Sequence, residues 1–91
     1  MSNRQIWKYE LRDAQINTVS MPRGACILSV QVQHGKPMVW ALVDPKAEAA
    51  RRTFHVVGTG WDFEPEGMAY VGTFQVSNGE LVFHLFEQVG P

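Results

Sequence analysis

The stretch from Ala25 to Asp44, ACILSVQVQHGKPMVWALVD, constrains the fold of this chain more than any other. Two runs, in which apolar residues alternate with other types, meet at the dipeptide His34-Gly35. Alternation with a period of two is typical of β-strands, and a two-residue connection that contains glycine joins antiparallel strands. The stretch therefore predicts a β-hairpin and assigns each of its side chains to one of two faces.

A two-residue turn at positions 34–35 sets the register of this hairpin. The reverse face is half polar and carries Trp40, so a second layer, a subunit or a ligand should cover that indole. The pairs on the other face are apolar throughout, and we expect them to pack on the core: Val32–Pro37, Val30–Val39 and Leu28–Ala41.

A second hairpin is predicted from Tyr70 to Phe86, with its turn at Asn78-Gly79. Both turn residues tolerate positive φ, which makes this dipeptide one of the strongest hairpin signals. The implied pairs are Val76–Leu81, Phe74–Phe83, Gly72–Leu85 and Tyr70–Glu87 on one face, and Gln75–Val82, Thr73–His84 and Val71–Phe86 on the other.

Shorter patterns predict the remaining elements. Ile6–Leu11 and Arg51–Val57 alternate as strands do, and Gln15–Ser20 suits a short edge strand. Asp44–Ala50 predicts a short helix, because Asp suits the N-cap, Pro suits the first helical position and alanines favour helix. Trp61–Met68 is expected to be an acidic loop.

These elements predict a single β-rich domain over residues 1–91, because 91 residues are too few for two cores of ordinary size. The fold class is all-β and mainly antiparallel, a small sandwich or barrel of about six strands with one short helix after Asp44. The hydrophobic content of 45% and the aromatic content of 11% supply a core and argue against disorder.

Composition excludes several classes of function. The net charge is −1 and no concentrated basic field is evident, so we expect no binding to a nucleic-acid polymer. Cys26 is the only cysteine, so the fold does not depend on a disulfide. We find no secretory h-region and no apolar run of the ~20 residues that span a bilayer. A cytoplasmic location without membrane contact is expected.

The sequence predicts neither a metal site nor a cofactor. His34, His55 and His84 lie in separate elements, without the close spacing that metal ligands need. Cys26 begins a strand and is expected to be a small core hydrophobe. No set of acid, base, nucleophile and oxyanion donors can be assembled, so we predict no catalytic residues and no enzyme activity.

The segment Gly58-Thr59-Gly60 invites comparison with a phosphate-binding loop. Such loops usually run into a helix N-terminus, whereas this one precedes an acidic stretch. A loop that ends a strand is the favoured interpretation, and an anion-binding nest of backbone amides beside Arg51 or Arg52 is the alternative.

Six residues carry a ligand-binding hypothesis. Two tryptophans could stack on a planar group, two arginines could bind a phosphate or carboxylate, and a threonine and a histidine of the last hairpin could bind polar groups. Each has a structural alternative, such as a solvated arginine pair or a hydrogen-bonded sheet histidine. The predicted ligand-binding residues are Trp40, Arg51, Arg52, Trp61, Thr73 and His84.

The segments IWKYEL, MPRGACILSVQVQ, VWALVDP, GTG and LVFHLFE follow one another along the chain. This pattern resembles a group of small uncharacterised proteins encoded by tailed phages and prophages, and the resemblance covers nearly the whole chain. It implies a small viral accessory protein in the host cytoplasm and supplies no catalytic residues. By analogy with compact phage proteins, it suggests binding of a host protein or of a nucleotide signal.

Two hypotheses follow. In the first, the chain is a non-enzymatic counter-defence protein that works as a homo-oligomer and sequesters a nucleotide-derived immune signal through the six residues above. In the second, it is a protein–protein interaction module, either an inhibitor of a host protein or a minor virion component, that uses a strand edge and the Trp40 face. A nucleotide ligand would raise the thermal stability of the folded state.

Overall fold

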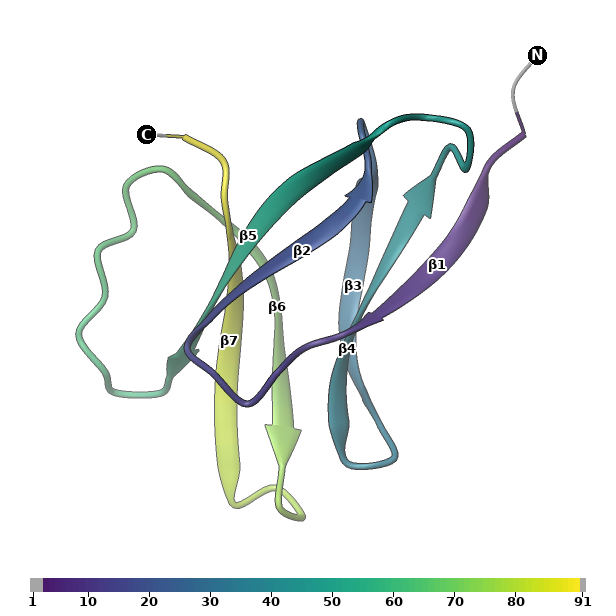
Figure 1. The fold of residues 1–91 in the computed structure, drawn as a ribbon. Coiled ribbons are helices and arrows are strands. Elements are labelled where there is room, and N and C mark those ends of the chain that lie inside the picture. Colours follow the sequence, from purple (N-terminus) through teal and green to yellow (C-terminus); the bar gives the residue numbers. More distant parts are fainter. Residues whose placement is uncertain (1–2, 91) are drawn as a thin grey trace.

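The computed structural model describes residues 3–90 as seven β-strands in two sheets (Figure 1). One sheet has three strands in the order β1-β4-β3, the other has four in the order β2-β5-β7-β6, and all neighbours are antiparallel. The all-β, antiparallel prediction is confirmed. The strands are β1 (Gln5–Glu10), β2 (Ile16–Pro22), β3 (Cys26–Gln33), β4 (Lys36–Val43), β5 (Ala49–Gly58), β6 (Met68–Val76) and β7 (Leu81–Gln88).

The core lies between the two sheets. In β4, Val39, Ala41 and Val43 are fully buried at alternate positions, which defines the inward face of the central strand. Phe54 of β5 is fully buried on the opposite side, and its burial stabilises the fold by about 1.5–3 kcal/mol. The buried cluster comprises Leu11, Met21, Ala25, Val30, Val39, Ala41, Val43, Phe54, Phe74 and Leu85.

The His34-Gly35 turn is confirmed, with φ of 54° and 79° at its two residues. The predicted register holds from Gln33–Lys36 to Ser29–Trp40 and then fails. A β-bulge places Ile27, instead of Leu28, opposite Ala41. The prediction that Leu28 packs on the core is therefore wrong, and this side chain is 47% exposed.

The Asn78-Gly79 turn is also confirmed, with φ of 57° and 87°. The predicted register holds from the turn as far as the pair of Gly72 with Leu85. A second irregularity between Tyr70 and Gly72 then pairs Tyr70 with Phe86 instead of Glu87. As a result Tyr70 lies on the outer face of the sheet and is 61% exposed.

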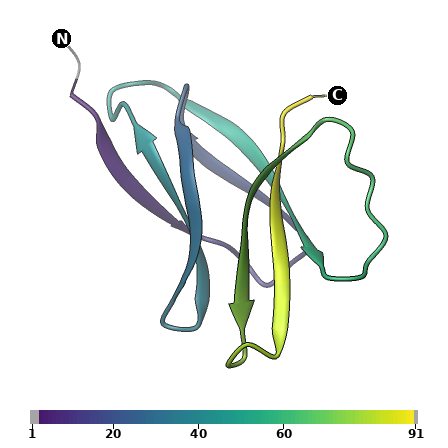
Figure 2. The same ribbon diagram turned by 180° about the vertical axis from the view of Figure 1, so that it is seen from behind.

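The two irregular strands are the ones at which the sheets meet. Figure 2 shows β3 and β6 side by side, and each is the edge strand of its own sheet. Gly72 of β6 makes the close approach possible, because a Cβ there would lie 2.8 Å from Cγ1 of Val30.

The short helix predicted after Asp44 is wrong. Asp44 instead closes a turn, in which its Oδ1 accepts a hydrogen bond from the Lys46 amide and its carbonyl accepts one from Ala47. The chain is extended again from Ala49, since Ala49 and Ala50 pair with the end of β2. Strand pairing thus overrides the helical preference of the alanines. Within residues 3–90 no helix is long and apolar enough to cross a membrane.

Candidate functional site

The predicted ligand-binding tryptophans lie on different surfaces. Trp40 is on the outer face of the three-stranded sheet, since its neighbours Val39 and Ala41 point inward. Lys8 Nζ lies 5.6 Å from the centre of the Trp40 ring. Trp61 follows β5 and lines a groove together with residues of both hairpin tips, among them Lys36 and Ser77. The structure therefore does not bring the two indoles together.

The predicted arginines are also apart, because neighbouring residues of a strand point to opposite faces. Arg52 lies between the sheets, whereas Arg51 is exposed on the outer face. Val57 is the strand partner of His84. Arg51 precedes Val57 by six residues, so it lies about 20 Å from His84 along β5. Thr73 and His84 are hydrogen-bonded, so these two predicted residues do come together.

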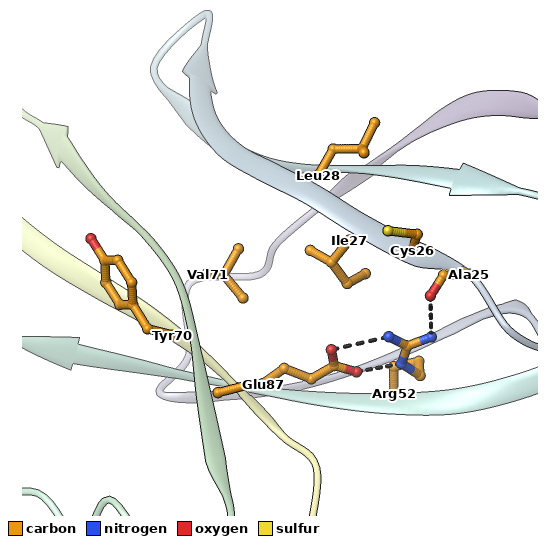
Figure 3. A pocket seen from close by; sticks show the side chains of 9 residues that line it. Ala25, Cys26, Ile27, Leu28, Arg52, Tyr70, Val71 and Glu87 are labelled. Carbon is orange, nitrogen blue, oxygen red and sulfur yellow. Dashed lines mark hydrogen bonds and ion pairs between the residues drawn. The ribbon is translucent and has the colours of Figure 1, made fainter.

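Arg52 forms an internal ion pair with Glu87 (Figure 3). Its Nε and Nη2 donate to the two carboxylate oxygens, and its Nη1 donates to the carbonyl of Ala25 at 2.8 Å. The hydrogen bonds with Glu87 raise the pKa of Arg52 above its ordinary value. Glu87 is buried, so this arginine neutralises a carboxylate and ties the two sheets together.

A pocket of about 410 Å³ lies above this ion pair. Figure 3 shows Ile27, Leu28 and Val71 around it, with the Cys26 thiol on one side. Cys26 is exposed, so the prediction that it is a core residue is wrong. Nε, Nη1 and Nη2 of Arg52 all donate to Glu87 or Ala25, so the pocket offers a ligand few free polar groups.

His84 lies on the outer face of the four-stranded sheet, between two threonine hydroxyls. Its Nε2 is 2.7 Å from Oγ1 of Thr59, and its Nδ1 is 2.9 Å from Oγ1 of Thr73. Thr59 Oγ1 donates to the carbonyl of Val82, so it accepts from Nε2–H. In the neutral imidazole Nδ1 then accepts from Thr73, whose oxygen accepts from the Tyr70 hydroxyl at 2.6 Å.

Aromatic rings adjoin this chain of hydrogen bonds. Tyr70 meets Phe86 edge-on, with ring centres 5.5 Å apart. Phe63, from the acidic loop, packs on the Phe86 ring as well, with ring centres 4.6 Å apart. The outer face of β6 and β7 thus joins a directed hydrogen-bond chain to an aromatic surface.

A groove of about 680 Å³ lies between the two sheets, at the end of the sandwich that carries both hairpin tips (Figure 1). The four-stranded sheet and its loop supply Trp61, Phe74, Val76, Leu81 and Phe83, and the other side supplies Leu11 and Pro37. Its rim is charged with both signs and includes Glu10, Arg12, Asp13 and Lys36.

Trp61 is held in the groove by close packing. Its ring meets Phe83 edge-on at 6.0 Å, and its indole lies directly over Gly58. A Cβ at Gly58 would lie 2.4 Å from Cε2 of Trp61, so glycine is required for this position of the indole. On the rim, Lys36 Nζ lies 3.4 Å from Oε2 of Glu10, which partly neutralises both charges.

The buried amide of Asn17 fixes the connection between β1 and β2, which supplies residues 11–15 to the groove lining. Asn17 Oδ1 accepts from the Arg12 amide at 2.7 Å, and its Nδ2 donates to the Ala14 carbonyl at 3.1 Å. The polar side of the groove is therefore a defined surface. In the part of the chain that the structure describes, no group of three or more His, Cys, Asp or Glu side chains could hold a metal ion.

Sequence reasoning missed three parts of these surfaces. Thr59 was expected to end a strand or to form part of an anion-binding nest, and not to bond a histidine. Tyr70 reaches the outer face through a bulge that no local pattern predicts. The groove had no signal apart from Trp61, because its walls come from both hairpins and from the β1–β2 connection.

Comparison with known proteins identifies a family whose function is unknown. A family model described as a domain of unknown function, DUF7352, matches residues 2–91. The comparisons with curated proteins and with solved structures gave no match. Since the matching model covers nearly the whole chain, the chain belongs to the DUF7352 family.

Proposed function

We propose that this protein is a non-catalytic protein–protein interaction module, and that the groove between the hairpin tips receives apolar side chains of a partner. The observation that carries the proposal is the exposure of large apolar side chains that line the groove: Trp61 is 50% and Leu81 48% exposed. Clustered apolar exposure of this kind marks interaction sites in soluble domains.

The dispersal of the predicted ligand residues supports this proposal over a nucleotide site. A nucleotide pocket needs cations for phosphate beside a surface for stacking. Of the two cations on the groove rim, Lys36 is paired with Glu10, which leaves Arg12 alone for a phosphate, and both predicted arginines lie elsewhere. The apolar walls instead suit leucine-like or aromatic side chains, which anchor protein interfaces.

The resemblance to phage and prophage proteins supports a host protein as the partner, and action in the host cytoplasm belongs to the same proposal. Counter-defence through a captured nucleotide is the competing function. A homo-oligomer would form if a second copy of the chain, instead of a host protein, filled the groove.

Photo-crosslinking in host cells tests the proposal. Benzoylphenylalanine is placed at Leu81, in the groove, and at Ile6, which is also exposed but lies on β1 away from it. We expect one protein adduct of defined mass from position 81 and none from position 6. Trp61→Ala should abolish the adduct, because it removes one wall of the groove.

The same experiment identifies the competing functions. An adduct that contains a second copy of the chain assigns the groove to self-association. Absence of an adduct, together with a rise in Tm with cyclic or ADP-ribose-like nucleotides, contradicts the proposal and supports nucleotide sequestration.

A further inference from the structure

We propose that the outer face of β6 and β7 docks a positively charged segment of a protein partner. This inference rests on the proposed function, because it assumes a protein partner, but it concerns a different surface from the groove. The face is defined by Tyr70, Thr73, Gln75, His84 and Phe86, and within residues 3–90 Tyr70 at one end of it stays 61% exposed.

The distribution of charge along the chain indicates which sign of charge the partner segment should carry. Residues 53–91 contain no Lys or Arg and five acidic residues, whereas residues 1–52 contain all eight basic residues and four acidic ones. The two parts therefore carry −5 and +4, which together give the net charge of −1. The C-terminal part forms most of β5 and all of β6 and β7, and three of its five carboxylates, Asp62, Glu64 and Glu66, lie together in the loop that joins β5 to β6.

Most of these carboxylates are free to meet a partner. Glu87 is paired with Arg52, but no ion pair involves Asp62, Glu64, Glu66 or Glu80 within residues 3–90. Asp62 and Glu64 flank Phe63, which packs on Phe86, and Phe86 meets Tyr70. The negative charge is thus beside the aromatic surface of the sheet.

The hydrogen-bond chain gives this surface an acceptor at its exposed end. With His84 neutral, Tyr70 donates its only proton to Thr73, so the Tyr70 oxygen can offer only lone pairs to a ligand. A lysine ammonium or an arginine guanidinium has donors and no acceptor. Such a cation could also lie over the exposed Tyr70 ring, a favourable cation–π arrangement.

A foreign basic segment suits this face better than a second copy of the chain. Four of the eight cations of this chain are already engaged within it, which reduces what a second copy could offer. The engaged cations are Lys8 with Gln33, Arg23 with Glu48, Lys36 with Glu10 and Arg52 with Glu87.

The test uses two labelled octapeptides, one alternating lysine with leucine and the other glutamate with leucine. Fluorescence anisotropy should show binding of the lysine peptide only, and added salt should weaken it. Glu64→Gln should weaken binding roughly two- to fivefold, as expected for one exposed charge contact. Glu48→Gln, an exposed carboxylate from the basic part, is the matched control and should leave binding unchanged.

Two tyrosine variants separate the contributions of the ring and the hydroxyl. Tyr70→Ala removes both and should weaken binding about two- to fivefold, whereas Tyr70→Phe keeps the ring and should lose less. Amide NMR signals of Thr73 and His84 should shift on titration, and the Trp40 signal should not. Tm measurements confirm that each variant is folded.

Equal binding of both peptides, equal effects of Glu64→Gln and Glu48→Gln, or shifts confined to other surfaces would overturn the inference. A dimer that forms at low salt and competes with the peptide would assign the face to a second copy and overturn it as well. Crosslinking from Leu81 is independent of all these results, so failure here leaves the groove proposal standing.

Discussion

Arg52 donates through two nitrogens to the carboxylate of the buried Glu87, and through a third to the carbonyl of Ala25. The first two contacts join β5 to β7 within one sheet. The third reaches the residue that precedes β3 in the other sheet, so a single side chain spans the sandwich. The arginine that the sequence offers as a ligand-binding group is therefore part of the framework.

Arg52→Ala should lower the free energy of unfolding by about 3–5 kcal/mol, because it leaves the Glu87 carboxylate buried without its cation. Urea denaturation at pH 7 measures the change. Arg51→Ala alters the neighbouring, exposed arginine and should change stability by no more than about 0.5 kcal/mol. Similar losses in the two variants would show that the ion pair does not hold the sheets together.

Tyr9→Phe should leave stability at pH 7 unchanged or raise it by about 1 kcal/mol, because the Tyr9 hydroxyl is buried without a hydrogen-bond partner among the described residues. Burial also raises the pKa of Tyr9 above its ordinary value of 10. The folded state therefore holds this proton more tightly than the unfolded chain does. Its contribution to stability is complete below pH 10 and is lost as pH rises through the higher folded value.

Urea denaturation at pH 7 and at pH 11 tests both parts of this prediction. The alkaline loss of stability should be smaller in Tyr9→Phe than in the natural chain. Tyr70→Phe is the control, because that hydroxyl is exposed and bonded to Thr73, and it should retain the alkaline loss. An undiminished loss in Tyr9→Phe would contradict the assignment.

Gly72→Ala should destabilise the protein by about 1–3 kcal/mol, because the new methyl group would lie 2.8 Å from Cγ1 of Val30 at the contact between the sheets. Val30→Ala in the same chain should recover part of the loss, since it removes the clashing methyl groups. Gly90→Ala, where a Cβ meets only ordinary contact at 3.5 Å, is the control. Additive effects of the two substitutions would refute direct contact.

Gly58→Ala should displace the Trp61 indole, whose ring occupies the space of the new methyl group. We expect a small loss of stability, because Trp61 lies in a loop and can move away. The indole N–H signal of Trp61 should shift in the NMR spectrum while that of Trp40 stays in place. Crosslinking from Leu81 should fall as well, since the groove loses a wall.

The sequence predicted well near the turns and less well away from them. The positions 34–35 and 78–79 and the pairs next to them hold, because a dipeptide that accepts positive φ acts locally. The alternating pattern also placed Thr73 beside His84. The register then slips near Leu28 and Val71, where β3 and β6 meet and no local pattern marks the change.

The amino-acid sequence by itself determined the two hairpins, the all-β class and the Thr73–His84 pair, because these follow from side-chain alternation and from local turn preference. The tertiary structure decided which partner Arg52 takes, that Ala49 and Ala50 are extended, and that Tyr70 faces outward. Each of these depends on contact between residues distant in the chain. Such contacts form only when strands from distant parts of the chain pair and the two sheets pack, and an edge strand at the contact between the sheets bends at an irregularity that no local pattern marks.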